Sequence, residues 1–146
     1  MVIRKLPSID GCKTWLNKQA KDKYLTGFPV IIHFFSLSCG LCHKMLPMII
    51  TWYNDFHLKG LKCVGIHHIK SVADDNVKEV RKFIRKNNIP YPVAFDEGNT
   101  LSKIFKIPFV PAFYFFDEKM NLRHFLAGEK GIDFLKIAVE NYFLKR

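Results

Sequence analysis

Two cysteines that lie three residues apart are the part of this sequence best suited to chemistry. Cys39-Gly40-Leu41-Cys42 directly follows the apolar run at residues 30–35, and a pattern with helical spacing begins at Leu41. The pair should therefore lie where a buried strand ends and a helix begins. The unpaired N–H groups and partial positive charge of a first helical turn favour a thiolate, the nucleophilic form of cysteine. At i and i+3 the two sulfurs share one helix face, so one can attack a disulfide and the other can resolve it.

The spacing of apolar residues predicts the elements that position this pair. A helix is expected over residues 39–58, because Met45, Ile49, Trp52 and Phe56 recur at i, i+4, i+7 and i+11, and Pro47 should kink it. Strands are predicted at 30–35, 61–67 and 91–95, around Thr14-Trp15-Leu16, and as a hairpin at 112–116 and 122–127. Further helices are predicted as one or two turns within 18–26, from a cap at Asp74 or Asp75 to residue 88, at 99–105 and at 132–144.

The order of these elements predicts an α/β fold. Strand, helix, strand, helix and strand in succession imply parallel strands joined by right-handed crossovers, and the late hairpin adds antiparallel strands. The result is a mixed central sheet with helices on both faces. A length of 146 residues, with 49% hydrophobic residues and 14 Phe, fits a single domain over 1–146 with a sizeable core.

Composition and cysteine usage limit the setting in which the chain works. The longest apolar run, residues 107–116, has ten residues and two prolines, so no membrane span is expected. The first seven residues show no secretory signal, and we expect a cytoplasmic protein. Four cysteines are too few for a disulfide scaffold. We interpret Cys63 as a buried structural thiol. No residue near Cys12 in the sequence would activate the Cys12 thiol.

The formal net charge of +10 raises the question of nucleic-acid binding. The only dense basic stretch consists of Lys78, Arg81, Lys82, Arg85 and Lys86. It lies on a predicted helix, where a solvated face is the usual explanation. We therefore expect no nucleic-acid binding, and a general attraction to acidic partners instead.

The layout and motifs resemble the thioredoxin superfamily. Within it they are most similar to the TlpA/ResA-like thiol–disulfide oxidoreductases, in particular the small soluble YkuV type. The resemblance covers nearly the whole chain and depends on Trp15-Leu16-Asn17, on residues 33–42 with Pro47, and on residues 110–117 and 122–125. A lone CxxC is a weak signal. A CxxC after a buried strand, a proline five residues on and a second proline that opens a late strand are strong in combination.

The resemblance implies roles for individual residues. Cys39 is the exposed attacking thiol and Cys42 the more buried resolving thiol. Pro111 falls where the family keeps a cis-proline, which would turn the Val110 backbone toward a substrate peptide. The alternative for Pro111 is a trans-proline that starts an edge strand. Phe35, Ser38, Gly40 and Leu41 complete the residues expected to contact a substrate.

The resemblance also implies the partners and the direction of electron transfer. The fold expected is a thioredoxin-like three-layer arrangement, and no cofactor beyond the Cys39–Cys42 disulfide is needed. The partners would be disulfide-containing proteins and an upstream thiol reductant, and the protein would be a monomer. Without an export signal, net reduction of cytosolic disulfides is the expected direction.

The sequence departs from the family pattern at three places. Leu41 replaces a common proline between the cysteines, where the intervening residues are expected to tune the reduction potential. Phe35 replaces a frequent Trp four residues before the first cysteine. The buried acid of thioredoxins falls at His33, and the glutamate of ResA-like members at Met45. His33 is thus the candidate proton carrier for Cys42, with a hydrogen-bonded core histidine as the alternative.

Three other functions compete with redox exchange. Cys39-Gly40-Leu41-Cys42-His43 matches the c-type haem motif CxxCH, although His43 is better explained as a solvent-facing helix residue. Zinc could be bound by Cys39 and Cys42 with Cys63 and either His67 or His68, but structural zinc sites usually use two close pairs, so no metal is expected. The third alternative is a non-catalytic thioredoxin-like module that binds partners through the groove by Cys39 and Pro111.

Overall fold

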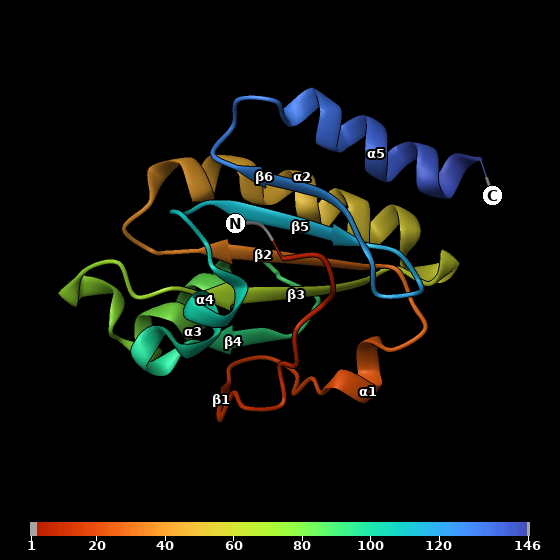
Figure 1. Cartoon of the computed structure of the whole chain (residues 1–146). Coiled ribbons are helices and arrows are strands. Elements are labelled where there is room, and N and C mark those ends of the chain that lie inside the picture. Colours follow the sequence, from red (N-terminus) through yellow and green to blue (C-terminus); the bar gives the residue numbers. More distant parts are fainter. Residues whose placement is uncertain (1–2, 146) are drawn as a thin grey trace.

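A computed structural model describes residues 3–145 and contains one mixed six-stranded sheet in the order β1-β4-β3-β2-β5-β6 (Figure 1). The strands are β1 (Thr14–Trp15), β2 (Val30–Phe35), β3 (Lys62–His67), β4 (Val93–Phe95), β5 (Ala112–Phe116) and β6 (Leu122–Ala127). The central pairs β2·β3 and β3·β4 are parallel, whereas β1, β5 and β6 pair antiparallel to their neighbours. The parallel crossovers and the late antiparallel hairpin agree with the prediction.

Helices cover both faces of the sheet, as predicted. They are α1 (Asp22–Leu25), α2 (Gly40–Phe56), α3 (Val77–Lys86), α4 (Thr100–Phe105) and α5 (Ile132–Leu144), and short 3-10 turns lie at His57–Lys59, Val72–Asp74 and Glu97–Asn99. One apolar cluster joins α2, α3 and α5 to the sheet, and a second joins α1, α4 and the N-terminal segment to the other face. The chain is therefore a three-layer α/β structure (Figure 1).

Strand β2 is the centre of the sheet and leads directly into the cysteine pair. All six of its residues are buried. Because side chains alternate between the faces of a strand, Ile31 and Phe35 join the α2 cluster, whereas Ile32 and Phe34 join the opposite one. A strand with both faces covered must be apolar throughout, which explains the continuous run in the sequence.

Helix α2 begins at Gly40 and runs to Phe56, slightly shorter than predicted. The four residues that predicted it, Met45, Ile49, Trp52 and Phe56, are all buried against the sheet. Pro47 lies inside the helix. The amphipathic stripe therefore fixes α2 over β2 and places its N-terminus at the end of that strand.

The start of α3 corrects one prediction. Neither Asp74 nor Asp75 caps this helix; the cap is Asn76, whose side chain accepts a hydrogen bond from the Glu79 N–H. Asp74 ends the preceding 3-10 turn and forms a capping box with Ser71. The late hairpin and α5, in contrast, have the predicted bounds.

None of the helices in residues 3–145 combines the length and the apolar character needed to cross a membrane.

Candidate active site

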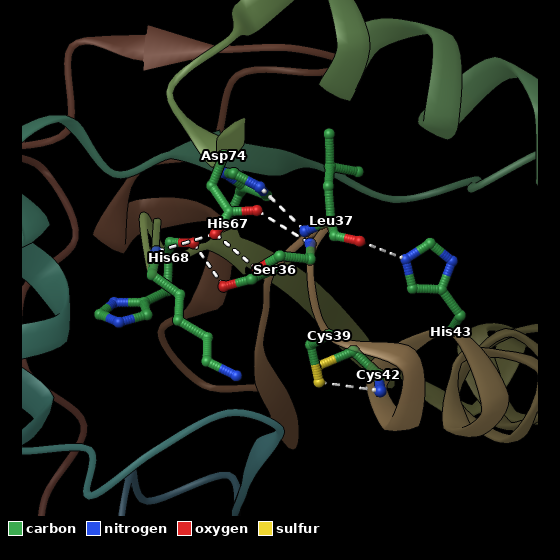
Figure 2. The surroundings of a disulfide bond; sticks show 10 residues. Ser36, Leu37, Cys39, Cys42, His43, His67, His68 and Asp74 are labelled. Carbon is green, nitrogen blue, oxygen red and sulfur yellow. Dashed lines mark hydrogen bonds between the residues drawn. A yellow bond between two sulfur atoms is a disulfide. The ribbon is translucent and has the colours of Figure 1, made fainter. Parts of the chain in front are cut away.

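Cys39 and Cys42 form a disulfide at the N-terminus of α2, with their Cα atoms 5.3 Å apart (Figure 2). Cys39 is the N-cap residue of the helix, and its Sγ accepts a hydrogen bond from the Cys42 N–H at 3.1 Å. A sulfur in this position takes the place of the oxygen that normally caps a helix. The free N–H groups and the dipole of a 17-residue helix thus act directly on Cys39.

The burial of the two cysteines differs from what was predicted. Both are buried, with 6% of each residue exposed, so Cys39 is not the more exposed partner in this oxidised form. The physical reason is that the sulfurs are bonded to each other and both residues pack on the core cluster that contains α2. What distinguishes them is the helix: Cys39 precedes it and accepts its N–H, whereas Cys42 belongs to its first turn.

The segment before Cys39 is held in place by side chains and backbone from the end of β3 (Figure 2). The Leu37 N–H donates to His67 Nε2 at 3.3 Å, and Ser36 Oγ donates to the His68 carbonyl at 2.5 Å. From the α2 side, His43 Nε2 donates to the Leu37 carbonyl at 2.8 Å. The backbone that delivers Cys39 is therefore fixed from both β3 and α2.

Asp74 accepts several hydrogen bonds that hold this segment. Its buried carboxylate accepts hydrogen bonds from the Ser38 N–H at 2.9 Å and the Ser38 Oγ at 2.8 Å. It also accepts from the Lys70 N–H at 3.0 Å and the Ser71 N–H at 2.9 Å. Burial alone would raise the pKa of Asp74, but these hydrogen bonds outweigh it and the pKa lies below its ordinary value. An ionised carboxylate thus joins the loop after β3 to the residue that precedes Cys39.

Sequence reasoning missed this role of Asp74. The pattern Ser71-x-x-Asp74 is a recognisable capping-box signature, so the hydrogen bonds between these two residues could have been predicted from the sequence. The bond to Ser38 connects residues 36 positions apart, and no local pattern announces it. The same holds for His67, which the sequence offered only as a zinc ligand.

The residues predicted to contact a substrate do not all reach the surface. Ser38 and Gly40 are exposed and Leu41 is partly buried beside the disulfide. Phe35 has only 4% of its surface exposed, and its ring packs under the site against Phe83 and His67. Its place at the end of a strand covered on both faces makes Phe35 a support for the site, contrary to the prediction.

The Val110–Pro111 peptide bond is cis, as the resemblance implied. The register of β2 with β5 pairs Phe34 with Ala112, so Pro111 lies next to the end of β2, where the segment toward Cys39 begins. Val110 packs on the cluster that contains both cysteines. The fold thus brings together two segments about 70 residues apart in the chain. A contact of Val110 and Pro111 with substrate stays a prediction.

His33 lies in the core of the sheet. Only 3% of it is exposed, and its Nε2 is 2.8 Å from the Tyr91 hydroxyl. Burial lowers the pKa of His33 to about 3, so the ring is neutral near pH 7. Gly65 on β3 pairs with His33 on β2. A Cβ atom added at Gly65 would lie 3.0 Å from His33 Nε2. These contacts match the core-histidine alternative, and a proton-carrier role stays a prediction.

The other candidate ligands are dispersed. The exposed His43 ring packs its edge against Phe83, with centroids 4.9 Å apart. Cys63 is fully buried in β3, and burial raises the pKa of its thiol well above the ordinary value. Cys12 is half-buried with its Sγ 3.5 Å from the Thr14 carbonyl, and burial raises its pKa too. Within residues 3–145, no group of three or more His, Cys, Asp or Glu side chains is placed to hold a metal ion.

Comparisons with known proteins agree with this geometry. The AhpC/TSA family model matches residues 4–125. The chain is 33% identical over 132 residues to the thiol–disulfide oxidoreductase YkuV of Bacillus subtilis (strain 168), covering 90% of this chain and 88% of that protein. It is 23% identical over 128 residues to the thiol–disulfide oxidoreductase ResA of Bacillus cereus, covering 88% and 69%. The solution structure of a thioredoxin-like protein in its oxidised form superposes with a TM-score of 0.86 at 30% identity, covering 97% and 96%.

These matches span the sheet, the cysteine pair and the late hairpin together. A likeness of this extent accounts for the thioredoxin-like fold, and the disulfide at the N-terminus of α2 accounts for the chemistry. The chain belongs to the AhpC/TSA family, and within it is a thiol–disulfide oxidoreductase whose redox couple is Cys39–Cys42.

Proposed function

We propose that the Cys39–Cys42 couple reduces disulfides in cytoplasmic proteins and is itself reset by an upstream thiol reductant. The observation that carries this proposal is the position of Cys39 as the N-cap of α2, where its sulfur accepts the Cys42 N–H. A thiolate formed there is stabilised by the helix terminus and is the competent nucleophile. In this role the protein would contribute to cell redox homeostasis.

The proposed reaction has two exchange steps. The Cys39 thiolate attacks one sulfur of a substrate disulfide, which forms a mixed disulfide and releases the other substrate sulfur as a thiolate. Cys42, after loss of its proton to solvent, attacks the Cys39 sulfur and frees the second substrate thiolate. Two electrons pass from the protein dithiol to the substrate, and the two released thiolates take up protons. The protein is left with the Cys39–Cys42 disulfide seen in the structure.

The proposed direction of electron transfer corresponds to a reducing compartment. In the cytosol, the glutathione pool keeps dithiols of this kind reduced. The electrons travel through sulfur alone, so we propose that no further cofactor takes part. Val110, Pro111, Ser38, Gly40 and Leu41 are the proposed contacts for the substrate backbone.

Single cysteine variants test the assignment of the two sulfurs. Insulin reduction driven by a chemical reductant should be abolished in Cys39→Ser, because the attacking thiolate is lost. Cys42→Ser should instead accumulate a mixed disulfide through Cys39, measurable as a mass adduct that dithiothreitol removes. The reverse pattern would exchange the roles of the two sulfurs. Turnover that is absent in the unmodified protein would point to a non-catalytic binding module.

A redox titration against glutathione tests the direction. A reduction potential near that of thioredoxin, about −270 mV, is expected for a general reductant. A potential above about −200 mV would contradict net reduction and indicate an oxidant or an isomerase.

A further inference from the structure

A groove lies between α3 and the segment that leads to Cys39. Its volume is about 350 Å³, and it is lined by Leu37, Glu79, Lys82, Phe83 and Lys86. Leu37 is two residues before Cys39, so the groove is continuous in the chain with the redox-active turn.

The floor of the groove is apolar and fixed. The Phe83 ring stacks on the buried Phe35 ring with centroids 5.7 Å apart, and the edge of His43 packs against Phe83 with centroids 4.9 Å apart. Leu37 is held at its N–H by His67 and at its carbonyl by His43. Leu37 and Phe83 are half-buried and already fixed. They can therefore accept one apolar side chain of a partner with little further loss of conformational entropy.

The charged residues of the groove are Lys82, Lys86 and Glu79, which leaves one positive charge in excess. Positions 79, 82, 83 and 86 share one face of α3, because they follow the i, i+3, i+4, i+7 spacing. This helix carries five cations and one acid, and the only acid, Glu79, pairs with Lys82 at 3.4 Å. Among residues 3–145, no carboxylate lies within ion-pair distance of the four other cations, which are Lys78, Arg81, Arg85 and Lys86.

We propose that this groove binds an acidic stretch of the substrate protein that flanks its reducible disulfide. One apolar side chain of that stretch would rest on Leu37 and Phe83, and its carboxylates would lie against Lys82 and Lys86. The inference depends on the proposed reduction of protein disulfides. A nucleic acid would satisfy the cations but brings neither a disulfide nor an aliphatic side chain to the apolar floor, so we favour an acidic polypeptide.

Matched disulfide peptides provide the substrate side of the test. Each contains the same intramolecular disulfide and one flanking Leu, with Glu, Gln or Lys at the neighbouring positions, and a fourth peptide replaces the Leu of the Glu series by Asn. The pre-reduced protein is mixed with each peptide, and reduced peptide is measured after acid quenching. At low ionic strength the Glu peptide should be reduced about tenfold faster than the Lys peptide, and the Leu→Asn change should slow it about threefold.

Charge-reversed variants provide the protein side. Lys82→Glu with Lys86→Glu should remove the preference for the Glu peptide, about a tenfold change. The control is Lys21→Glu with Lys23→Glu, which changes the net charge equally on exposed residues at α1. Helix α1 precedes β2 whereas Cys39 follows it, so the control lies at the other end of that strand (Figure 1). The control should retain the preference, and 0.5 M salt should reduce it in the unmodified protein and in the control because surface charges are then screened.

A small uncharged disulfide, hydroxyethyl disulfide, separates this inference from the proposed function. If the unmodified protein does not reduce it, the proposed function fails. If all variants reduce it equally but none distinguishes the peptides, only the groove assignment is overturned. An equal loss of preference in the control would show a general effect of net charge and overturn it as well. A DNA 20-mer and the oxidised Glu peptide are also compared as competitors of peptide reduction. Stronger inhibition by the DNA would assign the cations to nucleic acid instead.

Discussion

At the scale of single residues, two buried histidines contribute to the response of the protein to acid. Burial lowers the pKa of His33 to about 3, and it lowers the pKa of His67 to about 4 despite the nearby charge of Asp74. Both rings are therefore neutral in the folded protein near pH 7, and His67 uses its unprotonated Nε2 to accept the Leu37 N–H. Protonation of His67 would remove that acceptor from the segment before Cys39.

We predict a pH-dependent stability with a defined sign. The unfolded chain binds a proton at each histidine below about pH 6.5, whereas the folded chain does so only near pH 4 and pH 3. The free energy of unfolding should be highest above pH 6.5 and fall between pH 6.5 and 4, at up to about 2.7 kcal/mol per pH unit for two protons. His33→Gln should lower that slope in urea titrations by up to about 1.4 kcal/mol per pH unit, because it removes one buried group whose pKa is lowered in the folded protein. A slope unaffected by His33→Gln would contradict the assignment.

At the scale of elements, the loop between β3 and α3 positions the redox-active turn. Its Asp74 carboxylate accepts hydrogen bonds from Ser38 and from the backbone of its own loop. Helix α2 fixes the same turn from the other side through His43 and Leu37. The placement of Cys39 thus depends on contacts between elements as well as on the helix that it caps.

Removal of the Asp74 carboxylate should affect both stability and reactivity. Asp74→Ala leaves three backbone N–H groups without their acceptor, which should cost about 2–4 kcal/mol of unfolding free energy. The reduced Cys39 should then react with iodoacetamide at an altered rate and with an altered pH profile, because its backbone is no longer fixed. Asp74→Asn keeps an acceptor for Ser38 and should restore part of both properties.

Asp75→Ala is the matched control, since Asp75 is the exposed neighbour of Asp74 and only its backbone N–H is bonded. A pH profile of Cys39 alkylation that is identical in Asp74→Ala and Asp75→Ala would limit Asp74 to a purely structural role.

At the scale of the whole molecule, the sheet edges and the net charge oppose self-association. Strand β1 has two residues, and the start of β6 is bridged by the N-terminal segment, with Lys5 opposite Asn121 and the Leu122 N–H bonded to the Arg4 carbonyl. Short or covered edges offer little template for pairing with a second sheet. The formal charge of +10 adds repulsion between copies.

We predict that the oxidised protein is a monomer. Light scattering coupled to size-exclusion chromatography should give a mass of about 17 kDa at both low and physiological ionic strength. A mass that doubles as salt screens the net charge would contradict this prediction and indicate a self-complementary surface.

The sequence by itself determined the local structure and the redox couple. The strand before the cysteines, α2, the late hairpin and α5 were predictable because apolar spacing within each segment specifies them. The Cys39–Cys42 disulfide was predictable because both residues lie within one helical turn. The family resemblance correctly implied the cis bond before Pro111.

Only the tertiary structure decided how distant segments meet. It gave the order of the strands, the burial of Phe35 and Cys39, the partner of His33 and the bond between Asp74 and Ser38. It also placed Lys82 and Lys86 of α3 in one groove with Leu37. These features depend on residues tens of positions apart in the chain. Their contacts arise from packing across the sheet, and no periodicity within a single segment records them.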